Sequence, residues 1–231
     1  MLVLASASPR RRQLLRAWGV RFRTMPSQIT EPPPERWGAW CGPLQPQPGR
    51  ARPIPYARRL ARAKAEAVAR RLASRGKAAP GCSPAAHGPN TWVLGADTIV
   101  VTGWPGRARK PHILGKPRTK AEAERMLAQL SGTRHRVVTA VALIHAGTGT
   151  TRIAHAVSTV TMRRLTPAEI RRYARKHLDK AGAYAVQDAD DPVVTAIKGS
   201  YTNVVGLPEE VVRPLLRAVG LWPDQHRPER S

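Results

Sequence analysis

The sequence has few of the residues that build metal centres or disulfide frameworks. It contains two cysteines in 231 residues, Cys41 and Cys82, and they form no C-x-x-C pair and have no histidine nearby at ligand spacing. We therefore expect both thiols to be free and reduced. The seven histidines are scattered without metal-ligand spacing, and no apolar run reaches the roughly 20 residues of a membrane span. A histidine- or cysteine-based metal site and a transmembrane helix are both excluded.

The common signature loops are also missing. No G-x-G-x-x-G, Walker-type or G-x-S-x-G motif occurs, so a serine-hydrolase elbow has no support. The N-terminal residues 1–8 superficially resemble a short signal peptide. They lack a preceding basic stretch, however, and their apolar run of about four residues is shorter than the usual ~7–15. We interpret this segment as a buried first strand and expect a cytoplasmic protein.

Acidic residues are scarce: 15 Asp and Glu stand against 39 Lys and Arg, for a formal net charge of +24. Such a charge fits a nucleic-acid partner, an anionic small substrate, or simply the composition of a GC-rich genome. Only 8 of the 39 basic residues are lysine, and alanine, proline and glycine are abundant, which favours the third cause. Because no arginine block or basic run interleaved with aromatic residues appears, we expect no specific nucleic-acid partner.

Strand and helix patterns alternate along the chain, which predicts a mixed α/β sheet. The predicted strands are 2–5, 20–25, 92–96 with 99–102, 136–145, 152–163 and 193–197. The predicted helices are 9–18, 56–74, 120–130, 167–177 and 208–219. Two capping boxes, Thr119 to Glu122 and Thr166 to Glu169, mark helix starts. Residues 32–55, 76–90 and 104–112 are expected to be loops, and the tail after Trp222 to be frayed.

The first candidate site is Ser6-Ala7-Ser8-Pro9-Arg10-Arg11, where a strand leads into a helix. A helix N-terminus offers free N–H groups and partial positive charge, and arginine grips phosphate in a bidentate manner. The alternative is an ordinary N-cap with a solvated basic first turn. Arginines are unfavourable at that end unless an anion offsets them, which leaves phosphate binding open.

Two further candidates carry opposite charges. Lys64 shares the apolar stripe of the predicted helix with Leu60 and Val68, either as a functional cation or as a lysine snorkelling at the edge of the stripe. Asp97 follows the apolar strand 92–96, at the strand end where open α/β sheets place ligands. It either holds a divalent ion or accepts a proton from water, or it only forms a turn.

Three loops complete the candidates. Lys116 lies between Gly115 and Pro117 just before a capped helix, and is either functional or a plain loop lysine. The stretch 179–187 is rich in small residues and ends at Gln187, whose amide can read a base edge. The polar loop 199–203 either binds an anion or simply turns.

Taken in order, these stretches resemble the Maf family of nucleotide pyrophosphatases. The similarity is carried by Ser6–Leu15, Leu60–Ala65, Leu94–Thr98, Leu114–Arg118, Leu130–Gly132 with Thr139–Val141, Asp179–Gln187 and Gly199–Pro208. Each stretch is weak alone, but the ordered set spans residues 2 to 212 and is highly specific.

The resemblance implies a two-lobed, Maf/ITPase-like α/β fold with a twisted mixed sheet, flanking helices and a central cleft. It implies one domain over 1–231, with loop insertions at 38–53 and 76–90 and a frayed tail at 222–231. The expected enzyme is a homodimeric nucleoside triphosphate pyrophosphatase that uses Mg²⁺ or Mn²⁺ and cleaves between the α- and β-phosphates. The stretch from Asp179 to Tyr184 resembles the branch acting on dTTP and UTP.

The resemblance also implies roles for single residues. Asp97 is the expected proton acceptor, and Glu31 and Asp97 are the expected metal ligands. The phosphate site is expected to comprise Ser6, Ser8, Arg10, Arg11, Lys64 and Lys116. Base selection is expected to depend on Arg10, Thr98 and Gln187.

The sequence departs from the family pattern after Gln187, where residues 188–191 read Asp-Ala-Asp-Asp in place of the more usual glycines. Two rival functions stay open at this point. One is a basic nucleic-acid-binding or septum-inhibiting regulator without turnover, suggested by the charge. The other is a nucleotide sensor that binds without cleaving, against which the presence of both Glu31 and Asp97 argues.

Overall fold

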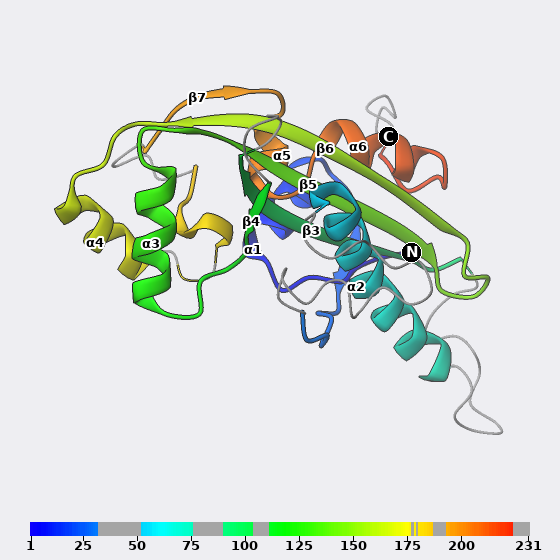
Figure 1. The fold of residues 1–231 in the computed structure, drawn as a ribbon. Coiled ribbons are helices and arrows are strands. Elements are labelled where there is room, and N and C mark those ends of the chain that lie inside the picture. The colour runs from blue at the N-terminus through cyan, green and yellow to red at the C-terminus, as the bar shows by residue number, and fades with distance from the viewer. Residues whose placement is uncertain are drawn as a thin grey trace.

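The computed structural model describes residues 1–31, 52–75, 90–103, 111–176, 178, 180–186 and 193–223. Within these ranges the chain forms a seven-stranded mixed sheet with helices packed on both faces (Figure 1), which confirms the predicted α/β class. Most residues of the loops predicted at 32–55, 76–90 and 104–112 lie outside the described residues, namely residues 32–51, 76–89 and 104–110, and so does the tail from 224. The single domain with two lobes stays a prediction. No described helix combines the length and the hydropathy that crossing a membrane requires.

The strand order is β2-β1-β3-β5-β6-β7, with β4 beside β3. The strands are β1 (Leu2–Leu4), β2 (Phe22–Thr24), β3 (Trp92–Thr102), β4 (His112–Leu114), β5 (Arg134–His145), β6 (Thr151–Met162) and β7 (Val194–Lys198). The helices are α1 (Pro9–Ala17), α2 (Pro53–Arg75), α3 (Lys120–Leu130), α4 (Pro167–Lys176), α5 (Tyr201–Val205) and α6 (Glu209–Arg217), with the 3₁₀ turn η3 (Ala181–Ala183). Among the described strands, parallel pairing is limited to β1, β2 and the start of β3.

Strand β3 is continuous, but one of its two edges pairs with other strands over only part of its length. We call this the interrupted edge. One edge pairs with β5 from Trp92 to Val101. On the other edge, β1 covers residues 92–94 and β4 covers residues 100–102. Between them, residues 95–99 have no strand partner on that edge in the described part of the chain. The prediction that Asp97 ends a strand is therefore wrong: it lies mid-strand, just past the carboxyl end of the parallel pairing with β1.

Side chains alternate across β3 and so meet two different layers. Val93, Ile99 and Val101 pack beneath α2 together with its apolar residues Leu60, Ala61, Ala65 and Val68. On the opposite face, Leu94 and Ala96 pack with Leu15 of α1 and with Val212 and Leu216 of α6. Figure 1 shows α2 along the long strands, with α3 and α4 gathered at their far end. By this alternation, Asp97 lies on the α2 face and Thr98 on the other.

Helix α2 packs unusually close to β3 at Gly95. A Cβ atom built on Gly95 would lie 2.3 Å from the Ala61 carbonyl oxygen and 2.8 Å from the Ala65 nitrogen. Real Cβ atoms do not come that close to backbone atoms, so only glycine permits this contact. The contacting turn of α2, from Ala61 to Ala65, includes Lys64, so the close packing holds Lys64 beside Asp97 of β3.

Local signals set most helix boundaries as predicted. Thr166 and Glu169 cap each other reciprocally, which confirms that capping box. Thr119 accepts the Glu122 N–H at 3.1 Å, but Glu122 Oε2 accepts the N–H of Arg118 in place of that of Thr119, so only the N-cap half of the other box is confirmed. Two elements differ from the prediction. Residues 112–114 form β4, and the polar loop near 200 forms the short helix α5, which ends at Gly206 with φ of 115°.

Candidate active site

One cavity of about 430 Å³ opens at the interrupted edge of β3. Nine residues predicted from the sequence line it: Ser6, Ser8, Arg10, Arg11, Glu31, Lys64, Asp97, Thr98 and Lys116. Together they come from the β1–α1 loop, α1, the segment after β2, α2, β3 and the loop after β4. Gln187 lies outside the described residues, although its neighbours Ala185 and Val186 line the cavity. The predicted cationic and acidic groups therefore share a single cleft.

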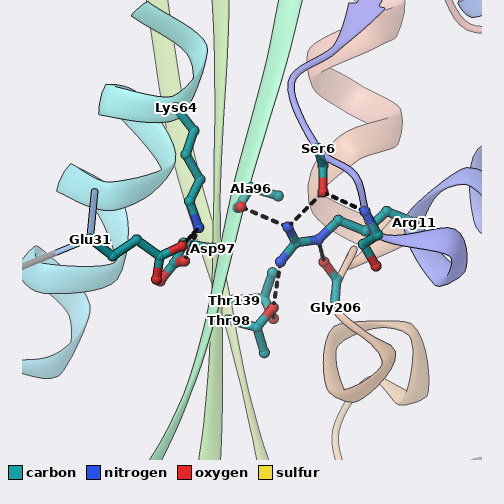
Figure 2. Close-up of polar contacts among 10 residues, drawn as sticks. Ser6, Arg11, Glu31, Lys64, Ala96, Asp97, Thr98, Thr139 and Gly206 are labelled. Carbon is teal, nitrogen blue, oxygen red and sulfur yellow. Dashed lines mark hydrogen bonds and ion pairs between the residues drawn. The ribbon is translucent and has the colours of Figure 1, made fainter. Parts of the chain in front are cut away.

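Lys64 bridges the two predicted acidic residues (Figure 2). Its Nζ lies 2.6 Å from Asp97 Oδ1 and 2.7 Å from Glu31 Oε1. Lys64 is 8% exposed and Asp97 is 4% exposed, whereas the Glu31 side chain is 39% exposed. The alternative of a lysine snorkelling to solvent is therefore wrong, because the ammonium group lies between two carboxylates.

The three charges stabilise one another. Burial by itself would lower the pKa of Lys64, but Asp97 and Glu31 outweigh burial and raise it. Burial would likewise raise the pKa of Glu31, but Lys64, with help from Lys116 and Arg11, lowers it overall. Lys64 and Glu31 are consequently both charged at neutral pH, and the cleft keeps a negative group beside its cations.

One oxygen of Asp97 has no hydrogen-bond partner. Among the described residues, Asp97 Oδ2 is buried and makes no hydrogen bond, while Oδ1 receives Lys64. A buried carboxylate oxygen without a partner is costly unless a ligand, water or ion completes it. The described residues include no cluster of three or more His, Cys, Asp or Glu. Two carboxylates nonetheless fit Mg²⁺, which takes much of its coordination from water and substrate phosphates.

The N-terminus of α1 forms the opposite wall of the cavity. Ser8 occupies the N-cap position as predicted, but its hydroxyl makes no capping hydrogen bond. Ser6 Oγ instead accepts the Ser8 N–H at 3.2 Å. Arg10 Nε is buried without a partner in the described part of the chain. The start of α1 thus presents hydrogen-bond donors to the cavity that have no acceptor among the described residues. Its first turn contains no acidic residue that would compensate their positive charge.

Arg11 behaves differently from Arg10. Its Nε donates to the Gly206 carbonyl at 2.8 Å, Nη1 donates to Ser6 Oγ at 3.2 Å and to the Ala96 carbonyl at 2.9 Å, and Nη2 donates to Thr98 Oγ1 at 3.1 Å (Figure 2). Four of its five N–H donors therefore go to protein acceptors. Its role as a phosphate ligand stays a prediction, and this geometry does not favour it.

The remaining wall comes from the loop after β4 and from residues 180–186. Lys116 is exposed at the rim, and the Gly115 carbonyl accepts the Gly182 N–H at 3.1 Å. Ala183 has a positive φ of 60°, a strained conformation for a residue with a Cβ, and such strain clusters at functional sites. Lys180 and Tyr184 also line the cavity but were assigned no role from the sequence. Both lie within the small-residue stretch 179–187, which was the available signal.

The back of this wall holds a buried histidine. His135 Nε2 lies 2.7 Å from Tyr184 Oη, and His135 is 2% exposed. Burial lowers the pKa of His135 to about 4 and raises the pKa of Tyr184. Both side chains are therefore neutral at physiological pH, and sequence spacing offered no sign of this pair.

The fold and cleft define a class: a mixed α/β protein in which a cationic helix end and paired carboxylates share one cavity. The chain belongs to the Maf family, because the model of that family, described as Maf-like protein, matches residues 1–219.

Several relatives match nearly the full chain. The protein named dTTP/UTP pyrophosphatase from Moorella thermoacetica is 42% identical over 228 residues, covering 95% of each chain. Proteins of the same name from Geobacter sp. (strain M21) and Myxococcus xanthus are 39% and 40% identical, covering 95% and 96% of this chain and 95% and 93% of their own lengths. The solved structure of the Staphylococcus aureus Ham1 protein aligns with a TM-score of 0.42 at 15% identity, covering 94% of this chain and 98% of its own.

Proposed function

We propose that this chain is a nucleoside triphosphate pyrophosphatase that hydrolyses dTTP, UTP or related modified pyrimidine nucleotides to the monophosphate and pyrophosphate. The observation that carries the proposal is Asp97 Oδ2, which no described residue contacts by a hydrogen bond and which lies at the cavity that also holds the N-terminus of α1. A potential base and an anion-binding helix end are thereby directed at one ligand. The names of relatives at about 40% identity support the pyrimidine substrates.

The triphosphate is bound by the cationic wall. Arg10 and Lys116 supply charge-assisted hydrogen bonds, each contributing roughly 1.5–3 kcal/mol. The free N–H groups of α1 and the hydroxyls of Ser6 and Ser8 add neutral donors. Since a triphosphate carries about four negative charges, these groups select a polyphosphate chain over a neutral ligand.

Asp97 acts as the general base. Its Oδ2 takes a proton from water, and the water oxygen forms a bond to the α-phosphorus. The bond from the α-phosphorus to the bridging oxygen breaks, so pyrophosphate leaves with that oxygen. Proton removal of this kind is typically worth about 10²–10⁴-fold in rate. Lys64 holds the Asp97 carboxylate in place, because its ammonium group donates to Oδ1 and leaves Oδ2 for the water.

Glu31 and Asp97 are the residues that would hold a divalent cation such as Mg²⁺ or Mn²⁺. When bound, the ion neutralises phosphate charge and polarises the α-phosphate. Lys64 already compensates both carboxylates, so they stay in place beside the cavity whether or not an ion is bound.

Base selection is assigned to Arg10, Thr98 and Gln187. Arg10 and Thr98 line the cavity, and the segment 180–186 leads from Lys180 towards Gln187 along its wall. The small residues of this segment leave room for a flat pyrimidine ring, which is consistent with the proposed substrates.

We further propose a cytoplasmic homodimer that has no membrane or specific nucleic-acid partner. In the described residues, β7 pairs only with Thr159–Met162 of β6, so the outer edge of Thr151–Ser158 has no strand partner. A long uncovered edge strand is a natural pairing surface for a second copy. Light scattering after size-exclusion chromatography should give a mass near 51 kDa, twice the 25.3 kDa of the chain; a mass of one chain would contradict the dimer.

The function is tested with a panel of canonical and modified triphosphates in the presence of Mg²⁺, with release of pyrophosphate as the readout. The wild-type protein should release pyrophosphate from dTTP and UTP faster than from purine triphosphates. Release of orthophosphate in place of pyrophosphate, or no release from any member of the panel, would overturn the proposal.

A further inference from the structure

A chain of hydrogen bonds, partly buried at Arg11 and fully buried at its far end, runs from Arg11 away from the cavity. Arg11 Nη2 donates to Thr98 Oγ1 at 3.1 Å, and Thr98 Oγ1 lies 3.0 Å from Thr139 Oγ1. Thr139 Oγ1 donates to the Asn203 carbonyl at 2.8 Å. Because the one hydroxyl proton of Thr139 goes to that carbonyl, Thr98 must be the donor to Thr139. The chain therefore has a single direction, from Arg11 through Thr98 and Thr139 to Asn203.

Asn203 anchors the far end of this chain. It is fully buried, and its Oδ1 accepts the Thr139 N–H at 3.1 Å. Its Nδ2 donates to the Val137 carbonyl at 3.1 Å and to Ser158 Oγ at 2.8 Å. All the hydrogen-bonding groups of this amide are thus satisfied by β5 and β6, which fixes α5 on the sheet.

Arg11 also contacts the other end of α5. Its Nε donates to the carbonyl of Gly206, the C-cap of that helix. A Cβ atom on Gly206 would lie 3.2 Å from Thr98 Oγ1 and 3.6 Å from Arg11 Nε, so a larger residue would crowd both partners. The guanidinium therefore connects the β1–α1 loop, β3 and α5 in one closed set of bonds.

We propose that Arg11 is a positioning residue and that Thr139 and Asn203 act through it, a role that rests on the proposed function. Contact with phosphate would require Arg11 to exchange bonds that it already makes with protein acceptors. Neighbouring Arg10 has a buried Nε without a partner in the described chain and is the better phosphate ligand. Arg11 instead fixes Ser6 and the start of α1 relative to Asp97 on β3.

The proposal makes a separate prediction for charge-preserving substitutions. Arg11→Lys keeps the charge but cannot reproduce four bonds in the planar geometry of a guanidinium. We expect Arg11→Lys to lower kcat about as much as Arg11→Ala, by about tenfold or more. At Arg10, by contrast, Lys should retain more activity than Ala, because charge is what that position supplies.

Thr139 tests the same chain from outside the cavity, since its side chain is fully buried and does not line the cavity. Thr139→Val should lower kcat more than it raises KM, and Thr139→Ser should restore most of the loss. Combined with Arg11→Lys, Thr139→Val should add little, because both break one chain of bonds. Thr133→Val, which loses a 2.8 Å hydrogen bond to the Leu130 carbonyl, is the control and should leave kcat unchanged.

Three results would overturn the proposal: near wild-type kcat for Arg11→Lys, unchanged kcat for folded Thr139→Val, or fully multiplicative effects in the double variant. Where Thr139→Val fails to fold, Arg11→Lys and Thr139→Ser decide. If the wild-type protein hydrolyses no triphosphate, the proposed function fails and calorimetry with inorganic tripolyphosphate tests the positioning role. Arg10→Ala should then weaken binding more than Arg11→Lys does, and the reverse order would contradict the role.

Discussion

Asp97 and Thr98 are neighbours on β3, and their side chains lie in two different kinds of surroundings. Asp97 belongs to a set of three charges and keeps one carboxylate oxygen without a partner in the described residues. Thr98 belongs to a chain of hydrogen bonds in which its proton and one lone pair are already used. The comparison indicates that a polar group without a hydrogen-bond partner marks the place of the reaction. Groups whose hydrogen bonds are all made hold the geometry around it.

The largest expected effect on activity comes from replacing the Asp97 carboxylate, whose Oδ2 is the proposed proton acceptor. Asp97→Asn replaces the proton acceptor with an amide of the same shape, and Lys64 keeps its partner Glu31. We expect kcat to fall by about 10²–10⁴-fold while the fold is retained. Pyrophosphate release and thermal unfolding measure the two effects. Glu66→Gln, on the exposed side of α2, is the control, and normal turnover by Asp97→Asn would contradict the assignment.

The largest expected change in the free energy of unfolding comes from removing Lys64, the cation between Asp97 and Glu31. Lys64→Met leaves two carboxylates facing each other, which we expect to cost about 3–5 kcal/mol in the free energy of unfolding. In the wild-type protein the pKa of Glu31 is lowered, so its contribution is complete above its unfolded value of 4.5 and is lost as the pH falls below it. In the variant, repulsion between the two carboxylates should raise the pKa of Glu31. The variant should therefore lose less stability, relative to the wild-type protein, at acidic pH than at neutral pH.

Urea unfolding of Lys64→Met at pH 7.5 and at pH 5 measures this reversal. Lys198→Met, at an exposed position of β7, is the matched control and should change little at either pH. A variant that loses stability equally at both pH values would show that packing, not charge, explains the loss.

Gly95→Ala tests whether Asp97 depends on the position of α2, the helix that carries Lys64. The new Cβ would overlap the Ala61 carbonyl, so α2 must shift away from β3. We expect a loss of about 1–3 kcal/mol in stability and a fall in kcat, because Lys64 leaves Asp97. Gly147→Ala, where a Cβ meets only the flexible His145 ring, is the control. Unchanged stability and kcat would mean that the close packing is not needed.

A last effect, confined to acidic pH, concerns a neutral contact of the cavity wall, that of His135 with Tyr184. The folded pKa of His135 is about 4, below its usual 6.5, so the unfolded chain binds more protons between these values. Stability therefore rises with pH across that window and is lost as the pH falls. The slope should reach about 1.4 kcal/mol per pH unit. Urea unfolding between pH 4.5 and 6.5 measures it, and His135→Gln should flatten it; the same slope in His135→Gln would contradict the assignment to His135.

Much of the fold was predictable from local patterns. Serine at the N-cap before Pro9, the two capping boxes and the turn around Gly147 to Gly149 each depend on residues close together in the chain. Strands β5 and β6 followed from long runs of β-branched residues. Such features are decided largely by backbone preferences over a few residues, so the local sequence is enough to predict them.

The edge of β3 was not predictable in this way. The carboxylate that follows the apolar run 92–96 suggested a strand end, but pairing with β5 carries the strand through to Val101. The short partner β4 and the helix α5 were missed for the same reason. Their stability comes from contacts with β3, β5 and β6, which lie far away in sequence.

The sequence by itself determined the family, the α/β class and the set of charged residues from which the cleft is built, because ordered motifs and local periodicity carry that information. Only the tertiary structure decided which of those residues make hydrogen bonds within the protein and which face the cavity. Arg11 reaches acceptors 85 and 195 residues away, and Lys64 reaches Asp97 across 33. Whether an arginine is free to bind phosphate or already satisfied depends on acceptors that folding brings to it, and no local pattern encodes them.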